Sequence, residues 1–78
     1  MSQIHAFLKI VDAYNAALAL SDTTTSWRVF QDSKKIAALR DGRDIQVKRL
    51  EAAIRWFAAH WPAEAVWPDD SPQPALEA

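Results

Sequence analysis

The chain has 78 residues, with nine lysines and arginines, ten acidic residues and a formal net charge of -1 at pH 7. A chain of this length forms one domain with a small core, and the absence of cysteine excludes disulfide bonds and thiolate metal sites. The lack of cysteine gives no support for secretion, so we expect a cytoplasmic protein. No apolar run approaches the roughly 20 residues that span a bilayer, so we expect it to be soluble and without membrane contact.

The composition predicts an all-α fold, because the chain contains 15 alanines and few residues that favour strands. A first helix is expected over residues 3–20. Its apolar residues recur at spacings of three and four, and they are Ile4, Phe7, Leu8, Val11, Tyr14 and Leu18. Phe7 and Tyr14 are therefore expected in the core.

A short helix is predicted over residues 22–30, within and after the polar cluster from Ser21 to Ser26. Ser21 is a suitable N-cap, because its hydroxyl can accept a hydrogen bond from a free backbone amide of the first turn. Val29 and Phe30 supply the apolar side of the last turn.

A second short helix is predicted over residues 33–41, with a cap site at residues 32 and 33. Ile36 and Leu39 lie three residues apart and form its buried face. Gly42 is the only glycine of the chain and is expected to end this helix in the left-handed conformation.

A longer last helix is predicted over residues 46–60, capped by either Asp44 or Gln46. Its apolar residues again repeat at spacings of three and four, and they are Val47, Leu50, Ile54, Phe57 and Trp61. The cations of this helix lie off the apolar stripe and are expected on a solvated face: Lys48, Arg49 and Arg55.

The composition changes after Trp61, because the remaining residues contain all four prolines and four of the ten acids. Pro62 is expected to end the helix. The segment to Trp67 is expected to fold back on the bundle or to join a dimer contact. We therefore predict one domain over residues 1–67 and a disordered, acidic and proline-rich tail over residues 68–78.

Charge is distributed unevenly along the chain. Eight of the nine Lys and Arg lie between residues 28 and 55, where four acids oppose them, so this window carries about +4 and the rest of the chain about -5. Such asymmetry indicates a basic face and an acidic tail.

The residue inventory indicates binding rather than catalysis. A single glycine excludes a Gly-rich phosphate loop, the two histidines lie far apart without carboxylates at metal-ligand spacing, and no nucleophile has an evident base. We therefore expect no catalytic residue, no metal site, no cofactor and no small-molecule substrate.

Residues 21–42 resemble the helix-turn-helix of lambda-repressor-like and Cro-like DNA-binding domains of phage and bacterial regulators. In the first motif helix the resemblance rests on Ser21 at the cap, Ser26 at the small packing position and Val29 at the apolar position. In the second it rests on Ser33 and Lys34 at the start, on Ile36 and Leu39 at the buried positions, and on residues 39–42 where the helix ends and turns.

The resemblance covers residues 4–61 and implies a compact four- or five-helix bundle that contains a helix-turn-helix. Phe30 stands where the family has glycine and Gln31 where it has an aliphatic residue. These departures allow a connection that is longer than the standard one or differently wound.

The resemblance also implies a sequence-specific regulator that binds double-stranded DNA, most simply a homodimeric repressor whose second motif helix, starting near Ser33, enters the major groove. The residues expected at the DNA are Thr23, Thr24, Arg28, Ser33, Lys34, Lys35, Ala38, Arg40 and Arg43. Among them, Ala38 is expected to meet a thymine methyl, whereas Arg40 and Arg43 are expected to hold the DNA backbone.

The remaining apolar residues indicate a protein interface. Trp27 is expected in the core or at an interface rather than stacked on a base, and Val66 and Trp67 are expected to supply the dimer contact. The alternative function is a small helical protein-interaction module, such as an adaptor, inhibitor or antitoxin-like partner, that uses its Trp-rich C-terminal surface. Cations that converge beside the second motif helix favour DNA, and cations scattered around the bundle favour the alternative.

Overall fold

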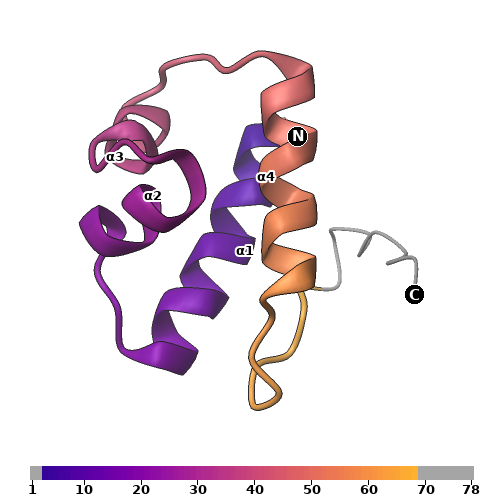
Figure 1. The fold of residues 1–78 in the computed structure, drawn as a ribbon. Coiled ribbons are helices and arrows are strands. Elements are labelled where there is room, and N and C mark those ends of the chain that lie inside the picture. The colour runs from indigo at the N-terminus through magenta and orange to yellow at the C-terminus, as the bar shows by residue number, and fades with distance from the viewer. Residues whose placement is uncertain (1–2, 69–78) are drawn as a thin grey trace.

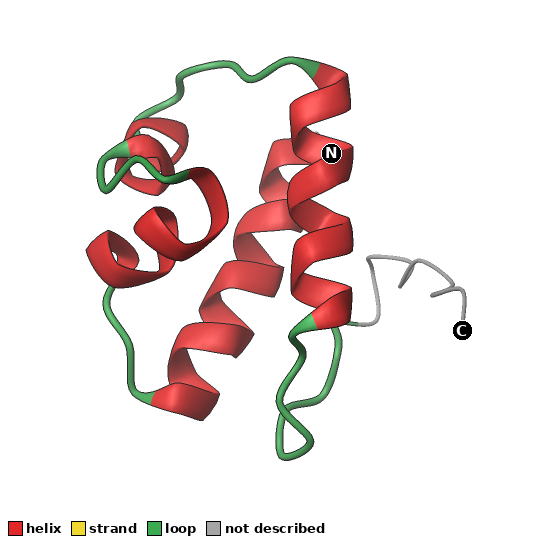
Figure 2. Cartoon of the chain, viewed as in Figure 1, coloured by secondary structure: helices red, strands yellow, loops and turns green. Residues whose placement is uncertain are grey.

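The computed structural model describes residues 3–68, which contain four α-helices and no strand (Figures 1 and 2). Helix α1 spans Gln3–Leu18, α2 spans Asp22–Phe30, α3 spans Lys35–Arg40 and α4 spans Val47–Ala59. The all-α prediction is confirmed for this part of the chain. Helices α1 and α4 lie side by side, and α2 and α3 pack against one side of this pair (Figure 1).

None of the four described helices is long and apolar enough to cross a membrane. Apart from Pro68, the predicted acidic tail lies outside the described residues.

The hydrophobic core is formed by α1, α3 and α4, and its buried residues are Phe7, Ile10, Val11, Tyr14, Ile36, Leu39, Leu50, Ala53 and Phe57. The Phe57 ring meets Phe7 at 5.7 Å and Tyr14 at 5.1 Å between centroids, in both cases edge to face. The core positions predicted for Phe7 and Tyr14 are thus confirmed. Leu18 and Val47 are instead 39% and 59% exposed, because they occupy helix ends.

Helix α1 ends at Leu18 rather than at the predicted residue 20. Ala19 takes the left-handed conformation, with φ of 54°, and the N–H of Leu20 donates to the Asn15 carbonyl at 3.0 Å. This is a Schellman-type ending, which most often has glycine at the left-handed position. The chain therefore turns sharply before Ser21.

Helix α2 has the predicted bounds and the predicted cap. Ser21 is extended, and its Oγ accepts a hydrogen bond from the Thr24 N–H at 3.3 Å. At the other end Gln31 takes the left-handed conformation, with φ of 55°, and its N–H still donates into the last turn of α2 at 2.9 Å. The connection to α3 therefore turns at Gln31 rather than at Phe30, and it covers residues 31–34.

Helix α3 is shorter than the predicted range of residues 33–41. Gly42 has φ of 99°. The N–H groups of Gly42 and Arg43 donate to the carbonyls of Leu39 and Ala38 at 3.2 and 3.0 Å, which completes a Schellman motif. The prediction that Gly42 ends this helix in the left-handed conformation is confirmed.

Helix α4 is one residue shorter at each end than predicted, because Gln46 is extended and His60 leaves the helical conformation. Beyond it, the Trp61 ring packs on Tyr14 with 6.3 Å between centroids, and Trp67 packs on Trp61 with 4.7 Å. The segment after α4 therefore folds back on the helices.

Candidate functional site

Helices α2 and α3 are joined by one buried hydroxyl group. Ser26 is fully buried in α2, and its Oγ donates to the Asp32 carbonyl at 2.5 Å and accepts from the Ile36 N–H at 3.0 Å. Ile36 lies in the first turn of α3, where backbone amides have no partner within the helix. Ser26 therefore caps α3 from the neighbouring helix and fixes the start of α3 against α2.

The turn before α3 carries the polar residues predicted at the DNA. Lys34 occupies the cap position of α3 without a side-chain cap bond, and its N–H donates to Oδ1 of Asp32 at 2.9 Å. The predicted cap at residues 32 and 33 is therefore corrected, because Asp32 closes the turn and Ser26 caps the helix. Lys34 is exposed, whereas Ser33 and Lys35 are half-buried.

The outward face of α3 is formed by a different alanine from the one predicted at a thymine methyl. Ala37 is exposed and Ala38 is half-buried. Sequence spacing does not separate the two, because in an α-helix they lie at similar angles from the stripe formed by Ile36 and Leu39. Arg43 is exposed in the connection that follows α3.

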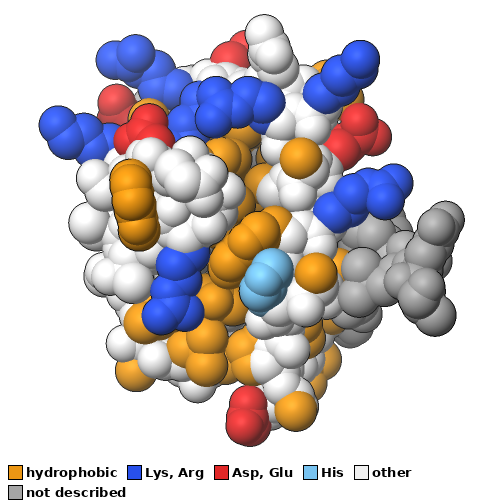
Figure 3. Space-filling view, in the orientation of Figure 1, with side chains coloured by type: hydrophobic (Ala, Val, Ile, Leu, Met, Phe, Trp, Pro, Cys, Tyr) orange, Lys and Arg blue, Asp and Glu red, His pale blue; other side chains and the backbone are white. Residues whose placement is uncertain are grey.

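Lys and Arg side chains gather over one end of the molecule (Figure 3). This end is formed by α3, by its connection to α4 and by the first turn of α4 (Figure 1). The cations in these segments are Lys35, Arg40, Arg43, Lys48 and Arg49, and Lys34 lies just before α3. Asp32, Asp41 and Asp44 lie in the connections on either side of α3, so positive charge at this end is concentrated but not uniform.

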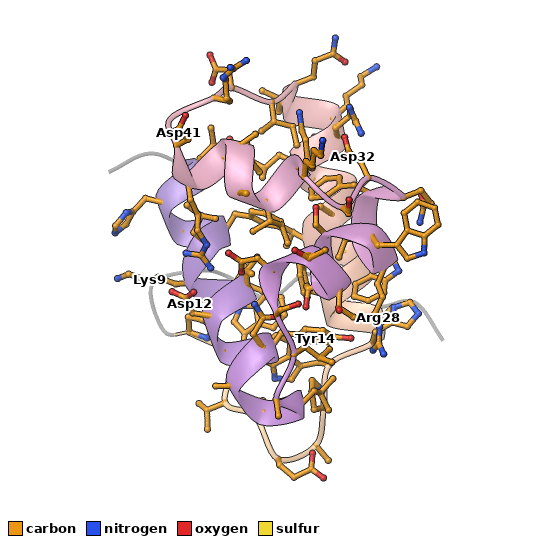
Figure 4. The ribbon with its side chains drawn as sticks, turned by 90° about the vertical axis from the view of Figure 1, so that its left-hand side faces the viewer. Lys9, Asp12, Tyr14, Arg28, Asp32 and Asp41 are labelled. Carbon is orange, nitrogen blue, oxygen red and sulfur yellow. The ribbon has the colours of Figure 1, made fainter. Side chains whose placement is uncertain are left out.

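The remaining predicted contacts lie on α2. Thr23 and Thr24 are exposed in its first turn, and Thr24 accepts a hydrogen bond from the Ser21 hydroxyl at 3.3 Å. Arg28 lies in the last turn, and its Nη1 donates to Oη of Tyr14 at 3.3 Å. Figure 4 shows Arg28 and Tyr14 pointing toward one another. Arg28 is thus directed toward α1 and not toward α3.

Arg40, predicted at the DNA backbone, is bound to carboxylates of its own chain. Its Nε donates to Oδ2 of Asp22 at 2.7 Å, and its Nη2 donates to Oδ1 of Asp12 at 2.6 Å and to Oδ1 of Asp22 at 3.2 Å. The hydrogen bond to Asp22, aided by that to Asp12, raises the pKa of Arg40 despite its partial burial. We call Arg40, Asp12 and Asp22 the Arg40 network; it joins α3 to α1 and α2.

No sequence pattern indicates the Arg40 network. Asp12 and Asp22 are separated from Arg40 by 28 and 18 residues, and neither belongs to a motif of known spacing. Only the packing of the three helices brings these side chains together.

Large apolar side chains are exposed on α2 and on the segment after α4. Trp27 is 58% exposed, so the core position considered for it is wrong, and the interface position stays a prediction. Val66 is 81% exposed, whereas Trp67 is half-buried against Trp61. The two residues predicted at the dimer contact therefore differ in their availability to a partner.

Within residues 3–68, no group of three or more His, Cys, Asp or Glu side chains could hold a metal ion. No family model matches the chain, and neither a curated protein nor a solved structure matches it.

Proposed function

We propose that the chain is a sequence-specific double-stranded DNA-binding regulator of transcription, most simply a homodimeric repressor, in which α2 and α3 form a lambda-repressor-like helix-turn-helix. The observation that carries this proposal is the start of α3. There, Lys34 is exposed beside Ser33 and Lys35, at the end of the molecule where Lys and Arg side chains gather. Side chains of these types at the start of a helix reach base edges and phosphates in the major groove.

The burial pattern of α3 supports its assignment as the recognition helix. Ile36 and Leu39 are buried, which leaves Lys34 and Ala37 on the solvent side. The proposed base contacts come from Ser33, Lys34 and Ala37, and the proposed phosphate contacts come from Thr23, Thr24, Lys35 and Arg43.

A homodimer is the most economical assembly for this function. A single DNA-binding module buries only about 600–1,000 Å² of protein surface on DNA, and two copies provide the specificity of two half-sites. The exposure of Val66, next to the Trp67–Trp61 ring contact, supports the segment after α4 as the dimer contact.

Binding to a duplex selected by the wild-type protein from a random pool tests the proposed function. Lys34→Ala should weaken binding to the selected duplex by about 1–3 kcal/mol, because a base contact is lost. Lys35→Ala should weaken binding to all duplexes alike and reduce the slope of log affinity against log salt by about one.

Arg55→Ala is the matched control, because it removes one exposed cation from α4, away from α3 in sequence. Fluorescence anisotropy at several salt concentrations measures the DNA affinity of the wild type and of the three variants. If the Lys34→Ala and Lys35→Ala variants both bind as the wild type does, the assignment of α3 as the recognition helix is wrong.

A second candidate function is a small helical protein-interaction module. The exposure of Trp27 favours it, since Trp is enriched among the residues that dominate interface energies. The selection experiment separates the two candidates, because an interaction module enriches no duplex from the pool.

A further inference from the structure

Helix α3 is held in place by polar contacts at both of its ends. It has six residues, fewer than the roughly 12–15 that an isolated helix needs to be even marginally stable in water. Its start is bound by Ser26 of α2, and Arg40, its last residue, is bound by Asp12 of α1 and Asp22 of α2. The angle of α3 on the molecule therefore depends on these contacts as well as on the burial of its apolar side.

The contact between Arg40 and Asp22 is bidentate, so it restrains the relative orientation of the two side chains as well as the distance between them. Nε and Nη2 of one guanidinium donate to the two oxygens of one carboxylate, at 2.7 and 3.2 Å, and such bidentate pairs restrain the relative orientation of both groups. Figure 4 shows Asp12, the second acceptor, on α1 beside α3, toward the end of α3 that Asp41 marks.

The carboxylate of Asp22 is in turn anchored to the interior. Its Oδ1 also accepts from Nδ2 of Asn15 at 3.0 Å, and Oδ1 of Asn15 accepts from the hydroxyl of Thr25. Thr25 is fully buried in α2. The chain of hydrogen bonds from Thr25 to Arg40 thus connects the core to the last residue of α3.

The charge of Arg40 is already balanced within the protein. Two carboxylates accept its hydrogen bonds, so a DNA phosphate that replaced them would lose those bonds and would approach two negative charges. This arrangement disfavours the phosphate contact that the sequence predicted for Arg40.

We propose that Arg40 is a positioning residue of the DNA-binding site: the Arg40 network sets the angle at which the outward face of α3 meets the bases, and Arg40 does not touch the DNA. This inference rests on the proposed function and adds a determinant of its specificity. Loss of the network therefore lowers binding to the selected duplex, while non-specific binding, which depends on phosphate contacts, is retained.

Two variants separate this role from a phosphate contact, since the two roles predict different results. Arg40→Lys keeps the positive charge that a phosphate needs but cannot form the bidentate contact. Asp12→Ala removes a carboxylate that competes with phosphate for Arg40. If Arg40 positions α3, both variants should bind the selected duplex about two- to fivefold more weakly, as expected for the loss of roughly 0.4–1 kcal/mol of contact energy, with non-specific affinity not reduced.

A phosphate contact gives the opposite pattern. Arg40→Lys would then bind as the wild type does, and Asp12→Ala would bind all duplexes more tightly because one of the two carboxylates that hold Arg40 is removed. Glu51→Ala is the control for Asp12→Ala, because it removes the same charge from an exposed position of α4 outside the Arg40 network. Circular dichroism checks that each variant is folded, and anisotropy measures binding to the selected duplex and to a scrambled duplex.

Failure of this inference is distinguishable from failure of the proposed function. A wild-type protein that enriches no duplex overturns both. A wild-type protein that discriminates between duplexes, with Arg40→Lys and Asp12→Ala variants that keep the same ratio of specific to non-specific affinity, overturns the positioning role alone. In the free protein, slow solvent exchange of the Arg40 Nε–H in NMR spectra supports the network, and fast exchange overturns it.

Discussion

The Ser26 hydroxyl donates to the Asp32 carbonyl and accepts from the Ile36 N–H, across the turn between α2 and α3. Ser26→Ala leaves the buried Ile36 N–H without its partner, so the free energy of unfolding should fall by about 1–3 kcal/mol. Urea unfolding measures this change. Thr23→Ala, at an exposed position of the same helix, should change stability by no more than about 0.5 kcal/mol. Equal effects of the two substitutions would show that the Ser26 hydroxyl does not stabilise α3.

The residues that could be predicted from sequence are those whose partners are close in the chain. Ser21 caps a helix through an amide three residues away, and Gly42 closes α3 through carbonyls of its last turn. The Ser26 contact to Ile36 spans 10 residues and the Arg40 contact to Asp12 spans 28. Such contacts depend on how the helices pack, which no local pattern determines.

At the scale of the helices, α1 and α3 end in similar left-handed turns formed by different residues. Ala19 has φ of 54° and Gly42 has φ of 99°. A side chain in this conformation costs about 1–2 kcal/mol, while glycine adds entropy to the unfolded chain. Ala19→Gly should therefore stabilise the protein by about 0.5–1 kcal/mol, and Gly42→Ala should destabilise it by about 1–2 kcal/mol.

Thermal unfolding of the two variants measures these opposite shifts. Open space surrounds the position that a Cβ of residue 42 would take, so the loss at Gly42 tests backbone conformation without a steric clash. A stabilising Gly42→Ala would contradict the assigned ending of α3.

The helices could be predicted where the apolar residues repeat over several turns or where a capping residue precedes the helix. The bounds of α2 agree with the prediction from Ser21 and Phe30. The predicted end of α1 was wrong because an alanine, which carries no turn signal, takes the left-handed position. The predicted start of α3 was wrong because the Lys34 N–H is bound by the Asp32 side chain before the helix begins.

For the whole molecule, the proposed dimer predicts a specific effect of Val66. Its side chain is 81% exposed, so Val66→Asp should leave the fold intact while placing a charge in the dimer contact. Sedimentation equilibrium should then show dimers for the wild type and monomers for the variant. Val47→Asp, at a residue 59% exposed at the start of α4, is the control and should remain dimeric.

A wild-type protein that is monomeric at high micromolar concentration contradicts the proposed dimer. If the Val66→Asp variant still dimerises, the dimer contact lies on another surface. Trp27 on α2 is then the first candidate, because it is the largest of the exposed apolar side chains in the described residues.

The separation of buried and exposed positions in α3 affects how the proposed DNA specificity of this protein can change. Ile36 and Leu39 face the core, whereas Lys34 and Ala37 face solvent, and exchanges at solvent positions usually change stability by no more than about 0.5 kcal/mol. On the proposed function, the preferred operator can therefore change through these outward positions while the scaffold is conserved. Related chains with the same buried residues and different residues at 34 and 37 would form a set of regulators with separate targets.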